Sequence, residues 1–93
     1  MMNVITLAAQ TSTGTATAIH IAPLNKYYTP VNSGVVQVVG SGTVTLEGSN
    51  DGTNFAAIAS GVTAGVKSVA LMPYMRANCT AYTSGTVTTS ICF

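Results

Sequence analysis

The residues of this chain that could take part in chemistry are few and dispersed. One histidine, His20, and two acidic side chains, Glu47 and Asp51, are all that the sequence contains of these types. Nucleophilic catalysis needs a base beside an oriented Ser, Thr or Cys, and a third group that orients the base. The sequence around His20 offers no such set. We therefore expect His20 to be a half-exposed histidine on a strand.

The two carboxylates are also badly placed for catalysis. Glycosidases use a pair of carboxylates that flank the scissile bond, whereas Glu47 and Asp51 are expected at the two shoulders of one tight hairpin. Together with Asn50 and Asn54 they could offer oxygen atoms to calcium, but the order of residues is not that of an EF-hand loop and only two formal negative charges are present. We expect a plain turn here, and a protein without enzymatic activity, metal or cofactor.

Two cysteines, Cys79 and Cys92, are too few to build a disulfide scaffold. A turn near residues 83–85 would place Cys79 opposite a residue near 89 or 90, so that Cys92 would lie too far away for a direct bridge. We expect buried thiols. A disulfide between subunits stays open as an alternative.

Composition points to a protein that associates with other proteins. Only 5% of the 93 residues are charged, against about a quarter in typical domains. The net charge of +1 gives no basic surface for a phosphate backbone, so we expect no nucleic-acid partner. No apolar run approaches the roughly 18 residues of a membrane-spanning helix. Because 47% of the residues are hydrophobic, the chain should fold, and its sparsely charged surface should be covered by a partner.

The order of residues predicts an all-β protein. Hydrophobic residues alternate with period two, Thr, Val, Ile and Tyr are common, and no window carries a helical stripe. Turn residues predict hairpins at 40–42, 49–52 and 83–85, with Gly52 in the left-handed region. We predict one domain, residues 1–93, with an antiparallel β-sandwich or jelly-roll-like fold. Its roughly eight short strands are expected at residues 3–8, 15–21, 26–29, 35–40, 43–48, 54–59, 66–72 continuing through 74–82, and 86–93.

Alternation also indicates which residues contact partners. Aromatic and Arg side chains are enriched in the cores of protein interfaces. On the strand that begins at Tyr74, even-numbered residues to Tyr82 should share an outward face, and Met75, Ala77, Cys79 and Ala81 should face the core. Two consecutive tyrosines on another strand cannot both point inward. The predicted interface residues are Tyr27, Tyr28, Tyr74, Arg76 and Tyr82.

Residues 43–93 carry a recognisable order of motifs. A Gly-Ser-Asn-Asp-Gly-Thr-Asn-Phe hairpin at 48–55 precedes Tyr-Met-Arg-Ala at 74–77 and Tyr-Thr-Ser-Gly-Thr-Val-Thr at 82–88. This set resembles small virion proteins of tailed bacteriophages, and most closely the capsid decoration (cement) class. The first hairpin alone is also similar to discoidin-like galactose-binding domains. Those domains usually carry Trp where this chain has Phe55, and they are much longer than 93 residues.

The resemblance implies a function outside catalysis. A cement protein would form homotrimers on the outer surface of the capsid, bind the major capsid protein where capsomers meet, and stabilise the head. It would be assembled in the host cytoplasm and located in the virion. Permanent assembly suits a chain of low charge, because obligate interfaces resemble a domain core cut in half. The alternatives are a receptor- or carbohydrate-binding module of a phage tail fibre, and a structural component of the tail or baseplate.

Overall fold

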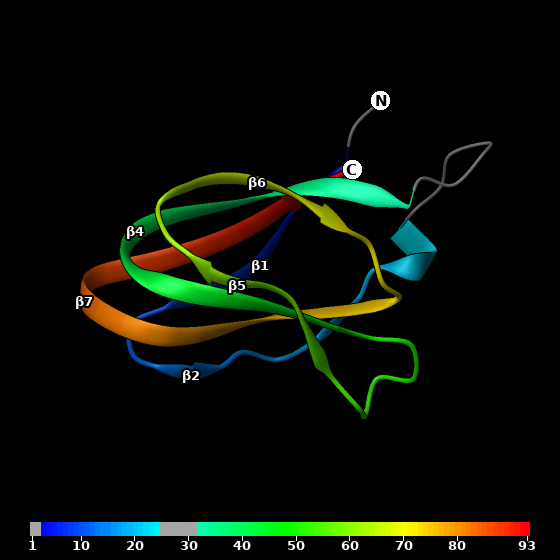
Figure 1. The fold of residues 1–93 in the computed structure, drawn as a ribbon, viewed down its shortest axis with the longest axis horizontal. Helices are drawn as coiled ribbons and strands as arrows, with labels where there is room; N and C mark the ends of the chain where they lie inside the picture. Colours follow the sequence, from blue (N-terminus) through cyan, green and yellow to red (C-terminus); the bar gives the residue numbers. More distant parts are fainter. Residues whose placement is uncertain (1–2, 25–31) are drawn as a thin grey trace.

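The computed structural model describes residues 3–24 and 32–93. Strands dominate this part of the chain, and all of them join one antiparallel sheet of seven strands (Figure 1). The predicted all-β class is confirmed. The elements are β1 (Val4–Gln10), β2 (Gly14–Thr15), β3 (Ile19–His20), the short 3₁₀ helix η1 (Ala22–Leu24), β4 (Ser33–Ser49), β5 (Ala56–Val62), β6 (Gly65–Ala70) and β7 (Tyr74–Cys92).

Two long strands form the centre of the sheet. β4 has 17 residues and β7 has 19, and they pair antiparallel from Val35 opposite Cys92 to Ser49 opposite Tyr74. The sequence led us to expect about eight short strands, with hairpins at 40–42 and 83–85. Both hairpins are wrong, because each segment stays in the ladder between β4 and β7 and neither pairs with its own flanks.

The central ribbon bends sharply where those two glycine-containing segments lie opposite each other (Figure 1). Val39 and Val44 of β4 face Thr88 and Cys79 of β7, so an advance of five residues on β4 is matched by nine on β7, with register shifts between. β7 follows the outer and longer path around the bend, and its extra residues form bulges, which sharpen strand curvature. The glycine-containing segments at 40–42 and 83–85 therefore form a bend in two paired strands, not two hairpin turns.

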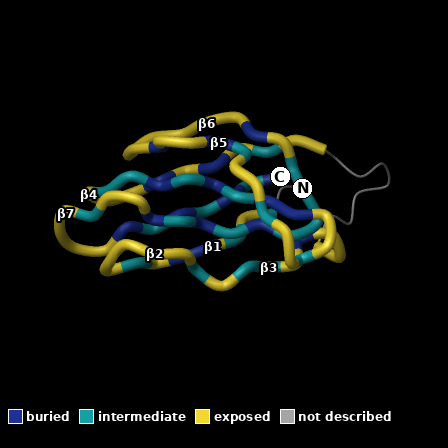
Figure 2. Tube along the Cα trace, turned by 60° about the horizontal axis from the view of Figure 1, so that its bottom comes forward, coloured by how far each residue is buried: buried dark blue, intermediate teal, exposed yellow. Residues whose placement is uncertain are grey.

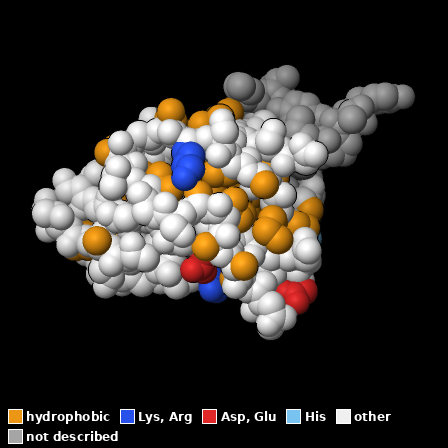
Figure 3. Space-filling model, viewed as in Figure 1, with side chains coloured by type: hydrophobic (Ala, Val, Ile, Leu, Met, Phe, Trp, Pro, Cys, Tyr) orange, Lys and Arg blue, Asp and Glu red, His pale blue; other side chains and the backbone are white. Residues whose placement is uncertain are grey.

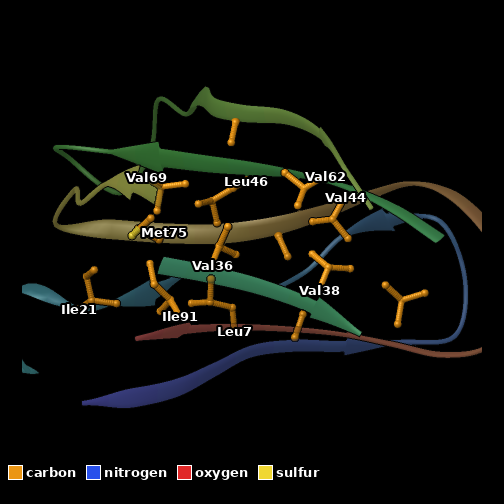
Figure 4. Close-up of a cluster of buried hydrophobic side chains, with 14 of the residues drawn as sticks. Leu7, Ile21, Val36, Val38, Val44, Leu46, Val62, Val69, Met75 and Ile91 are labelled. Carbon is orange, nitrogen blue, oxygen red and sulfur yellow. The ribbon is translucent and has the colours of Figure 1, made fainter. Parts of the chain in front are cut away.

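The bend divides the sheet into two halves. In the first half, the order is β6, the beginning of β4, the end of β7, and β1. In the second half, the end of β4 lies between β5 and the beginning of β7, and β7 also pairs with β2 and β3. The sequence predicted a sandwich. The strands instead form one continuous sheet whose halves lie on either side of a common core (Figures 1 and 4).

The core lies between the two halves and is almost entirely aliphatic. Alternate residues of β4 and β7 point into it, and their side chains meet from both halves of the sheet (Figure 4). Figure 2 shows that buried residues concentrate along β4 and β7, whereas β2, β5 and β6 are largely exposed. The largest fully buried hydrophobic side chains are Leu46, Met75, Ile91, Val36, Val38, Val44 and Val87. Each contributes about 1.5–3 kcal/mol when removed from water.

Bending at Gly40 requires glycine for two reasons. Its φ is +117°, and a Cβ added there would lie 2.4 Å from the carbonyl oxygen of Thr86. Gly85, on the other strand of the bend, has φ +71°, but nothing lies within 4 Å of its added Cβ. Gly40 is therefore required for its backbone conformation and for lack of space, whereas Gly85 is required for its backbone conformation alone.

We expect Gly40→Ala to destabilise the fold by about 3 kcal/mol or more, because backbone atoms must move to admit the methyl group. Gly85→Ala, the matched control, should cost only about 1–2 kcal/mol for its left-handed backbone. Urea unfolding of both variants measures the difference. Equal losses would contradict the steric role of Gly40.

A buried hydroxyl interrupts the core. Thr89 is fully buried, faces Ala8 and Val38, and its Oγ1 has no hydrogen-bond partner among the described residues. Replacing this unpaired group with a methyl group of similar shape removes a desolvation penalty.

We expect Thr89→Val to raise stability by about 1 kcal/mol, or the Tm by about 4–8 °C. Thr88→Val, on the outward side of the same strand, should stay within about 0.5 kcal/mol of the wild type. A lower Tm for Thr89→Val would show that the hydroxyl is bonded.

Candidate functional site

The outer surface of the second half gathers most of the polar chemistry of the described residues. Along β7, Tyr74, Arg76 and Asn78 point outward, while Met75, Ala77 and Cys79 are buried. The predicted alternation is confirmed over these residues. Cys79 is buried and Cys92 is half-buried. The expected neighbour of Cys79 is wrong, because Cys79 pairs with Val44 and Gly14 rather than with a residue near 89 or 90.

The alternation changes beyond Cys79, and two predicted orientations are wrong. A register shift between Thr43 and Val44 leaves Thr80 as an extra residue on β7, so the side chains of Ala81 and Tyr82 turn to the opposite face. Ala81, expected in the core, is exposed. Tyr82, expected on the outward stripe with Tyr74, packs against the core, and its hydroxyl donates a hydrogen bond to the carbonyl of Gly85 at 2.7 Å.

An ion pair joins the two central strands on this surface. Glu47 of β4 lies opposite Arg76 of β7, and Nε of Arg76 donates to Oε1 of Glu47 at 2.6 Å. Nδ2 of Asn78 donates to Oε2 of the same carboxylate at 3.2 Å. The guanidinium carbon of Arg76 also lies 3.9 Å from the centre of the Phe55 ring, a cation–π contact. Each of these polar groups is therefore engaged by a neighbour within the chain.

The aromatic rings are engaged in the same way. His20 of β3 lies opposite Tyr74, and the two rings stack with centroids 4.2 Å apart and planes 9° from parallel. Gly52 lies against the Tyr74 ring, since a Cβ added to it would be 3.1 Å from a ring carbon. His20 is a strand residue, as predicted, and its partner is a tyrosine rather than a nucleophile. These contacts leave Tyr74 less of its ring face for stacking on a ligand.

The loop between β4 and β5 is held by Asp51. Its Oδ1 accepts hydrogen bonds from the backbone amides of Thr53 and Asn54 at 2.8 and 2.9 Å and from the Ser49 hydroxyl at 2.8 Å. Oδ2 accepts from the side-chain amide of Asn54 at 2.8 Å. Gly52 has φ +77°, the left-handed conformation predicted for this turn. The backbone amides of Asn54 and Thr53, then the two side chains, hold the pKa of Asp51 well below its ordinary value.

The acidic side chains of this surface are each bonded to neighbours within the chain. Glu47 bonds Arg76 and Asn78, while Asp51 bonds its own loop, so the two carboxylates serve separate structural roles. Among residues 3–24 and 32–93, no group of three or more His, Cys, Asp or Glu side chains could hold a metal ion. The predicted contact residues Tyr27 and Tyr28 lie outside the described residues.

Sequence analysis did not identify a second surface, which is apolar and lies on the first half of the sheet. The outward side of the first half carries four exposed valines, which we call the valine face: Val4, Val35, Val39 and Val66. The signal was available in the segment Val35-Val36-Gln37-Val38-Val39, where valines occupy both alternating positions. One set must face away from the core whichever set is buried. The structure buries Val36 and Val38 and leaves Val35 and Val39 exposed.

Charge is sparse over the surface as well as in the sequence. Figure 3 shows a few basic and acidic side chains, one acidic and one basic group of which touch, on a face that is otherwise neutral, with hydrophobic side chains visible between them. Within the part of the chain that the structure describes, no helix has the length and apolar character needed to cross a membrane.

The Asp51 bonds generate a pH-dependent prediction. A carboxyl whose pKa is lowered by folding stabilises the protein above the ordinary value of about 4, and this contribution fades as the pH falls below it. We expect Asp51→Asn to lower the Tm at pH 7, and the gap from the wild type to narrow as the pH decreases from about 4 toward 2. Thermal unfolding followed by circular dichroism measures both. Asn50→Ala, an exposed change in the same loop, is the control, and a gap that is independent of pH would contradict the assigned role.

Comparisons with known proteins do not place the chain in a family. Searches against protein-family models, curated proteins and solved structures found no match.

Proposed function

We propose that this chain is a structural protein of a tailed-bacteriophage virion, a capsid decoration (cement) protein that binds the outer surface of the major capsid protein shell and stabilises the head. The observation that carries the proposal is the distribution of apolar and ionic groups. Four exposed valines share one sheet face, while the side chains that could do chemistry are bonded to one another elsewhere. An exposed apolar face, together with polar side chains that are bonded to one another, favours binding to other proteins over turnover of a substrate.

The charge inventory supports a protein partner. Of the basic residues that the structure describes, Arg76 is paired with Glu47, and Lys67 is isolated on β6. A phosphate backbone would need several clustered basic groups. A large neutral surface instead gains stability when a matching protein surface excludes water from it.

The motifs that resemble phage virion proteins have a structural basis in this fold. The 48–55 hairpin and the strand from Tyr74 are neighbours: Phe55 packs on Arg76, Gly52 packs on Tyr74, and Glu47 just before the hairpin pairs with Arg76. These residues therefore fasten one end of the second half, which accounts for their occurrence together. They support the resemblance as a shared framework, and the binding surface lies elsewhere.

The tail-fibre alternative finds less support in the geometry. Carbohydrate recognition commonly uses an aromatic ring with an open face, whereas Tyr74 stacks on His20 and Phe55 carries the Arg76 guanidinium. A tail or baseplate component would use the same neutral surfaces as a cement protein. The head assignment therefore rests on the resemblance, as do the proposed homotrimer, assembly in the host cytoplasm and location on the outer capsid.

Binding to capsid shells tests the proposal. Shells assembled without this chain, from the major capsid protein of the same genome, are mixed with purified chain at micromolar concentration and sedimented. We expect stoichiometric co-pelleting that changes little between about 50 and 500 mM salt, because the contact is neutral. Shells already saturated with the chain should take up no more. Absence of co-pelleting, or binding abolished by salt, would overturn the proposal.

A further inference from the structure

The valine face is a continuous surface. Val4 lies opposite Cys92, which lies opposite Val35, and Val66 lies opposite Gln37, two residues before Val39. The exposed fractions are 71% for Val4, 40% for Val35, 55% for Val39 and 68% for Val66. Only one other large hydrophobic residue in the described part of the chain is exposed, Leu24 at 38%, and it lies in η1. Exposed apolar side chains therefore concentrate on one side of the first half.

Among the described residues, no charged side chain lies on the same surface. Cross-strand partners share a face of a sheet, so the pairing defines the residues around the valines. These are small, hydroxyl-bearing or amide side chains: Thr6, Ala9, Gln37, Ser68, Ala70, Thr88, Ser90 and Cys92. Glu47, Asp51 and Arg76 belong to the second half, and Lys67 pairs with buried Val36, on the opposite side of β6.

We propose that a second copy of this chain covers the valine face, with the two sheets packed face to face about a twofold axis. This inference does not depend on the proposed capsid role. It replaces the homotrimer that the resemblance implies with a twofold pair, and it assigns the valine face to that pair rather than to the shell. Aligned sheets pack about 10 Å apart through side chains that interdigitate, and Val and Thr are suited to such surfaces. A twofold interface uses the same patch on both copies, so that residue i of one copy contacts residue j of the other and the reverse.

Charge favours a second copy over other partners. Two identical neutral faces meet without repulsion, and neither leaves an ionic group buried and unpaired. An ordinary protein surface, of which about a quarter is charged residues, would have to bury charges against valine. A nucleic acid or an anionic lipid headgroup would find no cation here. The chain itself is a source of the uncharged sheet surface that this face matches.

The size of the face predicts a moderate affinity. Four strands about 4.8 Å apart, each contributing about six residues at 3.4 Å, cover roughly 400 Å² in projection. About a dozen outward side chains take part, whereas standard interfaces use about 20–30 residues a side. We therefore expect pairs that form at micromolar concentrations and separate on dilution.

The edge of the first half favours face-to-face packing over sheet extension. β6 is an edge strand, and its Lys67 lies on the inward side, beside Val36. An inward-pointing charge is a common obstacle to pairing between edge strands, because a second sheet would bury it. Association through the valine face leaves Lys67 in water.

Sedimentation equilibrium of the full chain over a range of concentrations tests the proposal without any capsid. We expect the wild type to reach a mass of two copies, and Val39→Glu and Val39→Lys each to remain single. An equimolar mixture of the two variants should recover pairs, because a mixed pair holds opposite charges in one interface where each variant alone would hold like charges. Leu24→Glu, which adds the same charge at the exposed hydrophobic residue outside the face, should pair like the wild type.

Folding is checked by circular dichroism, and Val4→Glu provides a second disruption at the most exposed valine should Val39→Glu unfold. A wild type that stays single at about 100 μM, well above the micromolar range of weak specific contacts, overturns the inference. Pairing that survives both glutamate variants overturns it, as does a mass of three copies. Pairs that do not bind capsid shells would refute only the cement role, and single chains that do bind them would refute only the valine-face contact.

Discussion

Backbone hydrogen bonds join β4 to β7 from one end of the sheet to the other, and every other strand pairs with one of these two. β5 and β6 lie beside β4, while β1, β2 and β3 lie beside β7. Because the two strands bend together, one ladder supplies both halves of the sheet and faces them toward a common core. The position of each side chain depends on the register of this ladder and on the bulges at its bend.

Local patterns predicted what depends on neighbouring residues. Alternation identified the strand class and the buried residues Met75 and Ala77, and turn chemistry placed Gly52 in its left-handed conformation. Local patterns could not predict which strand pairs with which. A glycine-rich segment suits a hairpin or a bend equally, and the outcome at Gly40 depends on a strand more than 40 residues away. Likewise, the single extra residue at Thr80 reverses the orientation of Tyr82, and alternation alone gives no sign of it.

The same distinction between local patterns and long-range pairing applies to the candidate site. Sequence analysis placed Tyr74 and Arg76 on one face, and it expected Glu47 and Asp51 at the two shoulders of one hairpin. It could not show that Arg76 pairs with Glu47, since those residues lie on strands separated by β5 and β6. In the structure, Tyr74 and Arg76, which were predicted to contact a partner, also contact neighbours within the chain. It also exposes a face whose valines look like ordinary core residues in the sequence.

The place of β7 in both halves has a consequence for the nascent chain. Met75 and Ala77 complete the core of the second half, and Val87 and Ile91 complete that of the first. Neither half can close before these residues leave the ribosome, so the apolar segment of β4, which ends at Ser49, lacks its β7 neighbour until the end of the chain has been made. Pairing over such long sequence separations is slow, and exposed strands are prone to aggregate or to recruit chaperones in the meantime. Synthesis in quantity would therefore place a demand on the folding machinery of the cell, however simple the finished sheet.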